Sequence, residues 1–305
     1  MKAVIVLLSF CLPALADLAA GQQALKNADY ATAFREFLPL AEKGNALAQD
    51  YLGRMYSEGE GIPQDYNEAL KWFRLAASQG NTGAQSSLGV MYHEGQGVRQ
   101  DFVEAARWYR KAADQGEAIA QYDLGLAYAN GQGVVQDFVE AAHWYRKAAD
   151  QGRADAQAHL AMMYTAGQGV TQDYAEAARW FRKAADQGSF MAQSILGATY
   201  YSGLGVPQDY SQAVYWYRKA ADQGDAIAQY NLGLAYANGQ GVAQDYLQAH
   251  MWLNIAASRA SGDEQKKFAD ARDKVASKMS PSQIAEAQRL AREWKQKTEA
   301  PNDGK

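Results

Sequence analysis

Apolar residues recur along the chain in pairs of short stretches that have the spacing of helix faces. In residues 117–152 the first face is formed by Ala120, Leu124, Ala127 and Tyr128, at i, i+4, i+7 and i+8. A Gly-x-Gly turn follows it. The second face consists of Phe138, Ala141, Trp144, Tyr145, Ala148 and Ala149. The pattern predicts two helices in this block.

The same block recurs six times with a period of 36 residues. Tryptophans mark the period, at Trp72, Trp108, Trp144, Trp180, Trp216 and Trp252. Residues 45–260 therefore form six blocks without insertion or deletion. Such regularity indicates a solenoid, in which each unit buries its apolar face only by stacking on its neighbours. The predicted fold class is all-α.

An aspartate precedes the second helix of every block, with Glu or Gln three residues later, as in Asp137 and Glu140. Position and recurrence favour helix capping over acid catalysis. The Gly-x-Gly motifs also recur six times between helices, so we interpret them as turns and not as a phosphate cradle. The sequence Arg-Lys-Ala-Ala-Asp-Gln-Gly recurs late in the second helix, and its mixed charges favour a solvated face.

A mid-helix glycine recurs in five first helices, and Ala161 replaces it in the fourth block. The position is therefore limited by side-chain size, which indicates close contact between paired helices. We expect Gly125→Leu to disrupt stacking and Gly125→Ala to be nearly neutral.

The two ends differ from the repeats. Residues 1–16 have a positive n-region, an apolar run and an Ala14-x-Ala16 site, which predicts a cleaved signal peptide. A lipoprotein signal at Cys11 is the alternative, but Phe10 is bulky for the preceding position. Residues 17–44 are predicted to be a helical cap with an incomplete repeat, residues 261–298 a C-terminal helical cap, and residues 299–305 a disordered tail.

Composition narrows the classes of function. The formal net charge of −4 argues against nucleic acid and anionic lipid as partners. No integral membrane segment is expected after signal cleavage. His93, His143, His159 and His250 form no linear metal motif, and no nucleophile elbow is present. We expect no cofactor, no metal and no enzymatic activity, although residues from different repeats could still form a site that a linear motif does not reveal.

The repeated pattern A-Q-x-x-L-G-x-x-Y-x-x-G-x-G-V-x-Q-D-[YF]-x-x-A-x-x-W-[YF]-x-x-A-A-x-Q-G resembles the Sel1-like repeat (SLR) family, relatives of the tetratricopeptide repeats. The ending MSPSQIAEAQRLAREW is similar to the tail of bacterial members. The resemblance implies a right-handed superhelical solenoid of antiparallel helix pairs that acts as an adaptor for protein complexes, often at the bacterial cell envelope. Some exported members are β-lactamase-like and pair cysteines within repeats. This chain has no cysteine there, so that precedent does not transfer.

By analogy with the family, the first helices line a concave surface. On each first helix the positions that the core does not use form one stripe, at i, i+3, i+4, i+7 and i+11. The stripe contains both polar and apolar residues in the first blocks. From the third block onward it is apolar, with aromatic and Met side chains, which is typical of adaptable protein recognition. The predicted partner-binding residues are Tyr51, Arg54, Ile119, Tyr122, Leu126, His159, Met162, Met191, Ile195, Ile227, Tyr230 and Leu234. Packing of some of these side chains on a neighbouring repeat is the alternative.

Three function classes remain open. The leading one is a periplasmic or secreted adaptor that binds a peptide or protein segment, for example in envelope signalling or secretion. The second is a module that binds cell-wall material or exopolysaccharide, which would need exposed aromatic side chains. A β-lactamase-like hydrolase is the third.

Overall fold

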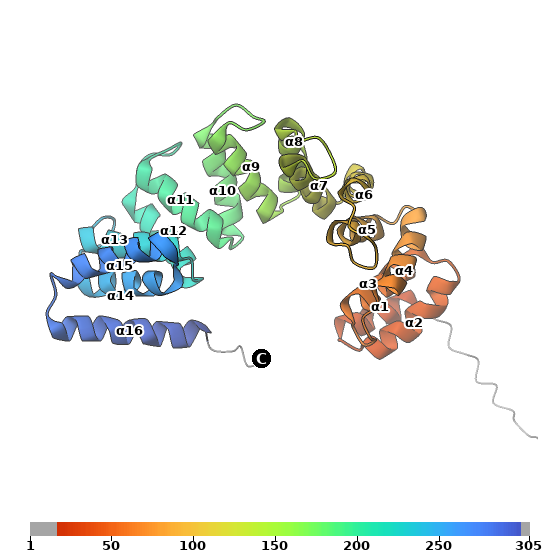
Figure 1. Ribbon diagram of the computed structural model, residues 1–305, viewed down its shortest axis with the longest axis horizontal. Helices are drawn as coiled ribbons and strands as arrows, with labels where there is room; N and C mark the ends of the chain where they lie inside the picture. Colours follow the sequence, from red (N-terminus) through yellow and green to blue (C-terminus); the bar gives the residue numbers. More distant parts are fainter. Residues whose placement is uncertain (1–16, 300–305) are drawn as a thin grey trace, which may run out of the picture. The chain divides into compact units, whose positions relative to one another are not determined.

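The computed structural model describes residues 17–299, which contain sixteen α-helices and no strand (Figure 1). The chain divides into two compact units, Met1–Gln136 and Asp137–Lys305, and each is described by itself. The predicted signal sequence, and residues 300–305 of the predicted tail, lie outside the described residues. The all-α expectation is confirmed over the described range.

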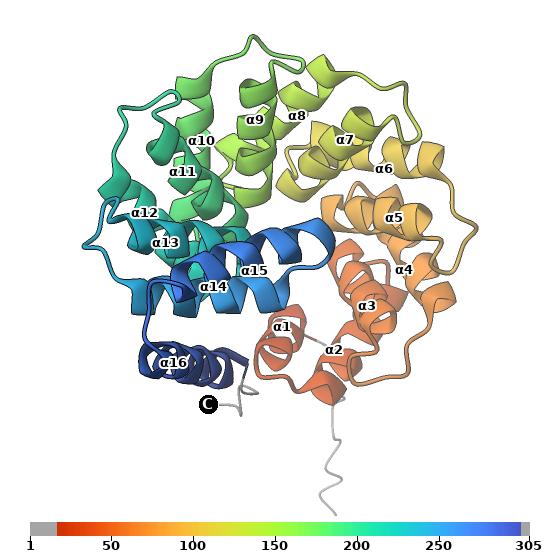
Figure 2. The same cartoon turned by 60° about the vertical axis from the view of Figure 1, so that its left-hand side comes forward.

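Unit 1 contains α1 (Leu18–Lys26), α2 (Tyr30–Glu42), α3 (Ala46–Glu58), α4 (Tyr66–Ser78), α5 (Thr82–Glu94), α6 (Phe102–Asp114) and α7 (Ala118–Asn130). Unit 2 contains α8 (Phe138–Asp150), α9 (Ala154–Ala166), α10 (Tyr174–Asp186), α11 (Phe190–Ser202), α12 (Tyr210–Asp222), α13 (Ala226–Asn238), α14 (Tyr246–Arg259), α15 (Gly262–Ala276) and α16 (Pro281–Glu299). Within each unit, successive helices stack in chain order (Figure 2). Helix α16 ends at Glu299, one residue beyond the predicted boundary of the cap.

The predicted aspartate caps are confirmed at all six second helices. At α6, one Asp101 carboxylate oxygen accepts hydrogen bonds from the amides of Val103 and Glu104, at 3.0 and 3.1 Å. Asp173 does the same for Ala175 and Glu176 at α10. These bonds satisfy amides that have no partner inside the helix, which explains why Asp recurs at this position.

The mid-helix glycines lie against the second helix of their own pair. A Cβ at Gly53 would lie 2.6 Å from the ring of Phe73, and one at Gly89 would overlap the ring of Tyr109. The predicted limit on size is therefore confirmed for these pairs. Even one methyl group at Gly53 or Gly89 requires the ring to move, so we expect alanine to be destabilising at these two positions, whereas the outcome expected for Gly125→Ala stays a prediction.

A chain of glutamine side chains connects consecutive repeats within each unit. In the second turn of a first helix, a buried glutamine such as Gln193 donates through Nε2 to the carbonyl oxygen of Ala185, at 3.0 Å, near the end of the preceding second helix. Its Oε1 accepts from Gln223, which follows the next second helix, at 2.8 Å. Gln49, Gln85 and Gln157 make the equivalent pairs of bonds. We call this arrangement the glutamine ladder.

The Arg-Lys-Ala-Ala-Asp-Gln-Gly segment is not simply a solvated face, and that expectation is corrected. Its arginine donates to a tyrosine 18 residues later, on the first helix of the next repeat, as Arg182 does to the hydroxyl of Tyr200 at 2.6 Å. Its lysine covers the tryptophan three residues earlier, with Lys183 Nζ 3.8 Å from the ring centroid of Trp180. Its glutamine belongs to the ladder. The arginine and the glutamine of the segment therefore bond to other helices, whereas the lysine covers a ring of its own helix.

The two caps close the array at its ends. At the N-terminal end, Phe37 of α2 is fully buried against residues of α1 and α3. At the other end the charged stretch after Ala260 forms α15, which packs on α14 through Phe268 and Val275. Helix α16 also packs on α14, with the rings of Trp252 and Trp294 5.6 Å apart.

Candidate functional site

The predicted partner-binding residues all remain at least partly accessible. We call the accessible positions of the first helices the first-helix stripe. Arg54, Ile119, Met191 and Ile227 are exposed. The other predicted residues are half-buried: Tyr51, Tyr122, Leu126, His159, Met162, Ile195, Tyr230 and Leu234. Their accessibility is compatible with a binding surface, and their contact with a partner stays a prediction.

In unit 1 the stripe lines two grooves between successive first helices. One groove, of about 430 Å³, runs from α3 across α5 to α7 and is lined by Arg54, Ser86, Val90 and Ile119 among others. The second, of about 360 Å³, lies between α5 and α7 and includes Leu126. Ser86 and Val90 occupy stripe positions of the second block, which are Gly83, Ser86, Ser87, Val90 and Glu94. They were not among the predicted partner-binding residues.

Two stripe residues of the first repeat have structural contacts. Tyr51 stacks on Phe37 with ring centroids 4.7 Å apart and accepts a hydrogen bond from Gln22. Asp50 is buried, and burial raises the pKa of its carboxyl while Arg54, at 3.1 Å, partly offsets the shift. The N-terminal end of the stripe is therefore fixed by packing on the cap and by this ion pair.

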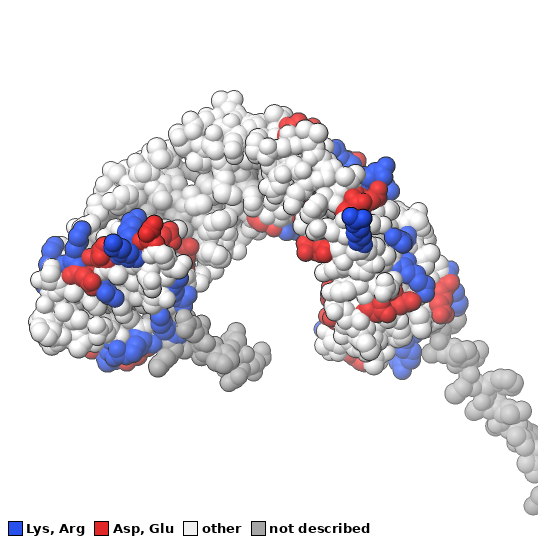
Figure 3. Space-filling view, in the orientation of Figure 1, with Lys and Arg blue, Asp and Glu red and all other residues white. Residues whose placement is uncertain are grey.

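In unit 2 the stripe carries no charged residue on α11, whereas on α9 it includes Asp155 and His159. A groove of about 190 Å³ between these helices is lined by Ile195 and Ala198, with Phe181 of α10 and Leu204 from the following turn. His159, on α9, is half-buried, and the centroid of its ring lies 5.2 Å from that of Tyr145 on α8. In the view of Figure 3 the surface over α9 to α11 is almost free of charged side chains.

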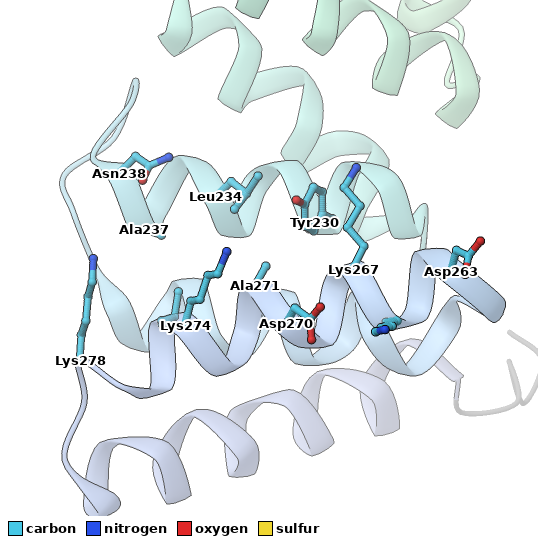
Figure 4. A pocket seen from close by; sticks show the side chains of 12 residues that line it. Tyr230, Leu234, Ala237, Asn238, Asp263, Lys267, Asp270, Ala271, Lys274 and Lys278 are labelled. Carbon is cyan, nitrogen blue, oxygen red and sulfur yellow. The ribbon is translucent and has the colours of Figure 1, made fainter.

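A further groove, of about 540 Å³, lies between α13 and α15 in unit 2. Tyr230 and Leu234 line it from α13 (Figure 4). The facing residues of α15 and of the segment after it were not predicted: Asp263, Lys266, Lys267, Asp270, Ala271, Lys274, Val275 and Lys278. The 36-residue period could have predicted them, because α15 begins 36 residues after α13 and its residues therefore occupy the positions of a further first helix.

The arrangement offers extended surfaces between successive first helices. Among the described residues, no group of three His, Cys, Asp or Glu side chains could hold a metal ion. No described helix has the length and apolar character to cross a membrane. Five of the six periodic tryptophans are buried, and the sixth, Trp108, is half-buried. Tryptophan therefore offers little of the exposed aromatic surface that the glycan-binding alternative needs.

Comparison with known proteins agrees with this repeat architecture. A family model of the Sel1 repeat matches residues 46–81, 82–117, 118–152, 154–189, 191–225 and 226–261. The chain is similar to a solved Sel1 repeat protein from Oxalobacter formigenes, with 35% identity, 80% of this chain and 100% of that chain covered, and a TM-score of 0.71. A protective antigen of uropathogenic Escherichia coli strains that displays an SLR fold shares 30% identity, covering 92% of this chain and 84% of that chain, with a TM-score of 0.48. No curated protein sequence matches the chain.

Proposed function

The chain belongs to the Sel1 repeat family, whose members are protein–protein interaction scaffolds, and from this premise we propose that it holds a segment of a partner protein along the first-helix stripe. The observation that carries the proposal is the set of grooves between successive first helices, lined by the predicted stripe residues in both units. Repeat solenoids present such extended surfaces because each unit contributes an equivalent strip of side chains.

The exposed apolar side chains of unit 2 favour a protein ligand. Met191 and Ile227 are 38% and 49% exposed and lie on first helices that carry few charges. Accessible apolar side chains in a row favour burial against the apolar side chains of a partner. Met also adapts its shape to different partners.

Capture by paired variants tests this proposal. The chain from residue 17 onward is immobilised and exposed to an envelope extract of the producing organism, and retained proteins are identified by mass spectrometry. The test variant carries Met191→Glu and Ile227→Glu. The control variant carries Val139→Glu and Tyr215→Glu, two second-helix positions that are 65% and 48% exposed.

Proteins that bind the wild type and the control but not the test variant are the expected partners of the stripe. Equal retention by the test and control variants would contradict the proposal. Circular dichroism spectra that match the wild type establish that both variants are folded.

Export forms part of the same proposal and is supported by the contact at Asp17. If cleavage follows Ala16, Asp17 becomes the N-terminus, and its nitrogen lies 3.0 Å from a carboxylate oxygen of Glu36. The α-ammonium group that cleavage creates would then meet a carboxylate. Asp17 also caps α1 by accepting from the amide of Ala19.

N-terminal sequencing of the mature protein tests export. We expect a chain that begins at Asp17 in the periplasm or the medium. A lipid-modified chain beginning at Cys11 would support the lipoprotein alternative, and an intact Met1 in the cytoplasm would contradict export.

We propose that the scaffold is not an enzyme, in keeping with the typical role of this solenoid fold. Turnover of a β-lactam by the purified chain would overturn this. The glycan-binding alternative would have to use exposed aromatic side chains such as Tyr201 and Tyr215, and no comparison supports it.

A further inference from the structure

Helix α15 continues the first-helix stripe although its sequence has lost the repeat pattern. Its first residue, Gly262, lies 36 residues after Ala226, the first residue of α13. Phe268 takes the buried place of Leu232, and its ring stacks on that of Tyr230 at 4.5 Å. The stripe positions of α13 therefore have counterparts in α15, and these counterparts line the groove between the two helices.

The chemistry of the stripe changes at this helix. Where α13 presents Tyr230 and Asn231, α15 presents Lys266 and Lys267, and Lys274 takes the place of Asn238. With Lys278, four lysines and two aspartates line the groove, so its charge is positive although the whole chain is acidic. Within residues 17–299 none of these four lysines forms an ion pair.

Two of the lysines are held by aromatic rings. Lys267 Nζ lies 5.0 Å from the ring centroid of Tyr230, and Lys278 Nζ lies 5.2 Å from that of Tyr246. Such cation–π contacts restrict the ammonium groups without neutralising them. Figure 4 shows Lys267 and Lys274 reaching from α15 toward α13, over an apolar floor that includes Leu234 and Ala271.

We propose that this groove binds an acidic peptide segment of the partner, with an apolar side chain on the floor and carboxylates on the lysines. The inference rests on the proposed scaffold function and adds the chemistry of the bound segment. Lys267 and Lys274 are seven residues apart on one helix, a rise of about 10 Å. A polyproline II segment has three residues per turn and rises about 3.1 Å per residue, so carboxylates three residues apart in it lie on one face and are separated by about 9 Å. An Asp-x-x-Asp segment in this conformation therefore matches the spacing.

Fluorescence anisotropy with defined peptides tests the inference. The probe is a fluorescein-labelled peptide of twelve residues with Leu at its centre and Asp residues three apart around it. Matched peptides replace every Asp by Asn or by Lys, or replace Leu by Ser. The protein is the chain from residue 17 onward, as wild type or as the Lys274→Glu/Lys278→Glu variant, in which both changes lie at exposed positions.

The Lys26→Glu/Lys43→Glu variant is the matched control, because it makes the same change of charge at exposed positions of unit 1. The wild type and the control are expected to bind the Asp peptide about tenfold more tightly than the Asn peptide, and more weakly as salt is raised. The Lys274→Glu/Lys278→Glu variant is expected to lose this difference. The Ser peptide is expected to bind more weakly than the Leu peptide.

Equal affinity for the Asp and Asn peptides, preference for the Lys peptide, or an unchanged Asp preference in Lys274→Glu/Lys278→Glu would each overturn the inference. Failure of the scaffold proposal is distinguishable from this. If the Met191→Glu/Ile227→Glu variant loses partners while the wild type shows no Asp preference, the scaffold stands and the acidic ligand is wrong. If that variant retains every partner, the scaffold proposal itself fails.

Discussion

Gln223 donates from its Nε2 to the Oε1 of Gln193 across 2.8 Å, although the two residues are thirty positions apart, at opposite ends of the same repeat. Gln193 in turn donates to the carbonyl oxygen of Ala185. One buried amide therefore joins the ends of two second helices, and it adds a side-chain donor to a carbonyl that also accepts from the backbone N–H of Gly188. The ladder supplies a polar contact whose geometry fixes the register between repeats.

Replacing Gln193 by leucine should lower the free energy of unfolding by about 1–3 kcal/mol, because the substitution removes the hydrogen bonds to the carbonyl of Ala185 and from Gln223, each worth about 0.5–1.5 kcal/mol. Urea denaturation followed by circular dichroism measures the loss.

Gln229→Leu is the matched control, since the Oε1 of Gln229 has no partner among the described residues and only the bond to Ala221 is removed. We expect the loss at Gln193 to exceed the loss at Gln229 by about 1 kcal/mol, the value of one hydrogen bond. Equal losses would show that the bond between glutamines contributes nothing.

Gly89→Ala should destabilise the chain, because the new methyl group would overlap the ring of Tyr109. The cost of forcing a packed ring aside is about 1–3 kcal/mol, which exceeds the gain of about 1 kcal/mol in helix propensity. A Cβ at Gly83, in the same helix, would come closest to the flexible end of Arg54, at 2.8 Å, and would lie 3.3 and 3.4 Å from side-chain oxygens of Asp50 and Asn81, so Gly83→Ala should cost less than Gly89→Ala. Thermal unfolding compares the two, and a loss of the same size in both would refute the argument from close packing.

Gly97→Ala should cost more than Gly95→Ala. Both glycines have a positive φ, 67° and 74°, so each substitution carries about 1–2 kcal/mol of backbone strain. A Cβ at Gly97 would also lie 2.6 Å from the carbonyl oxygen of Tyr66, in the preceding repeat, whereas one at Gly95 would have no contact closer than 3.3 Å. Denaturant midpoints test the order, and a larger loss for Gly95→Ala would contradict it.

Acidification should weaken the fold through His250. Burial lowers the pKa of His250, Arg272 lowers it further, and Asp273 partly opposes the shift. In the unfolded chain a histidine titrates near pH 6.5, so below about pH 6.5 the unfolded state binds more protons than the folded state. The free energy of unfolding should therefore fall as the pH falls from about 6.5 toward the lowered pKa.

The His250→Gln variant should show a shallower fall in unfolding free energy between about pH 6.5 and 4.5. His143→Gln, at an exposed position of α8, is the control and should keep the wild-type slope. If His250→Gln and the wild type have the same slope, His250 does not carry the acid sensitivity.

Most of the fold could be predicted because its signals are local or strictly periodic. The aspartate caps act within three residues, and the glycine turns follow from positive φ angles at fixed positions. The close contact at the mid-helix glycines could be predicted because Ala161 replaces the glycine in one repeat, which shows that the position requires a small side chain. In each case the residues that determine the local structure lie within a single repeat and can be recognised in its sequence.

The bonds between repeats could not be assigned in the same way. A residue present in every repeat has an equivalent partner in every other repeat, so periodicity alone does not tell which copy it contacts. The sequence therefore predicted a solvated Arg182, whereas Arg182 donates to Tyr200. Periodicity likewise did not tell which glutamine Gln223 contacts. The lysine-lined groove was missed for the opposite reason. The residues of α15 no longer match the pattern, although the helix keeps its place in the register.

The equivalence of the ladder bonds has a consequence for how the array can change in length. Each junction within a unit repeats the separations of eight and thirty residues, so a duplication or loss of one whole 36-residue module would recreate the bonds it interrupts. An insertion of any other size would leave buried amides facing the wrong neighbours. Arg259 lies 36 residues after Gln223, at the position of a further ladder glutamine. It donates to the carbonyl oxygen of Gly224, and the glutamine ladder ends there.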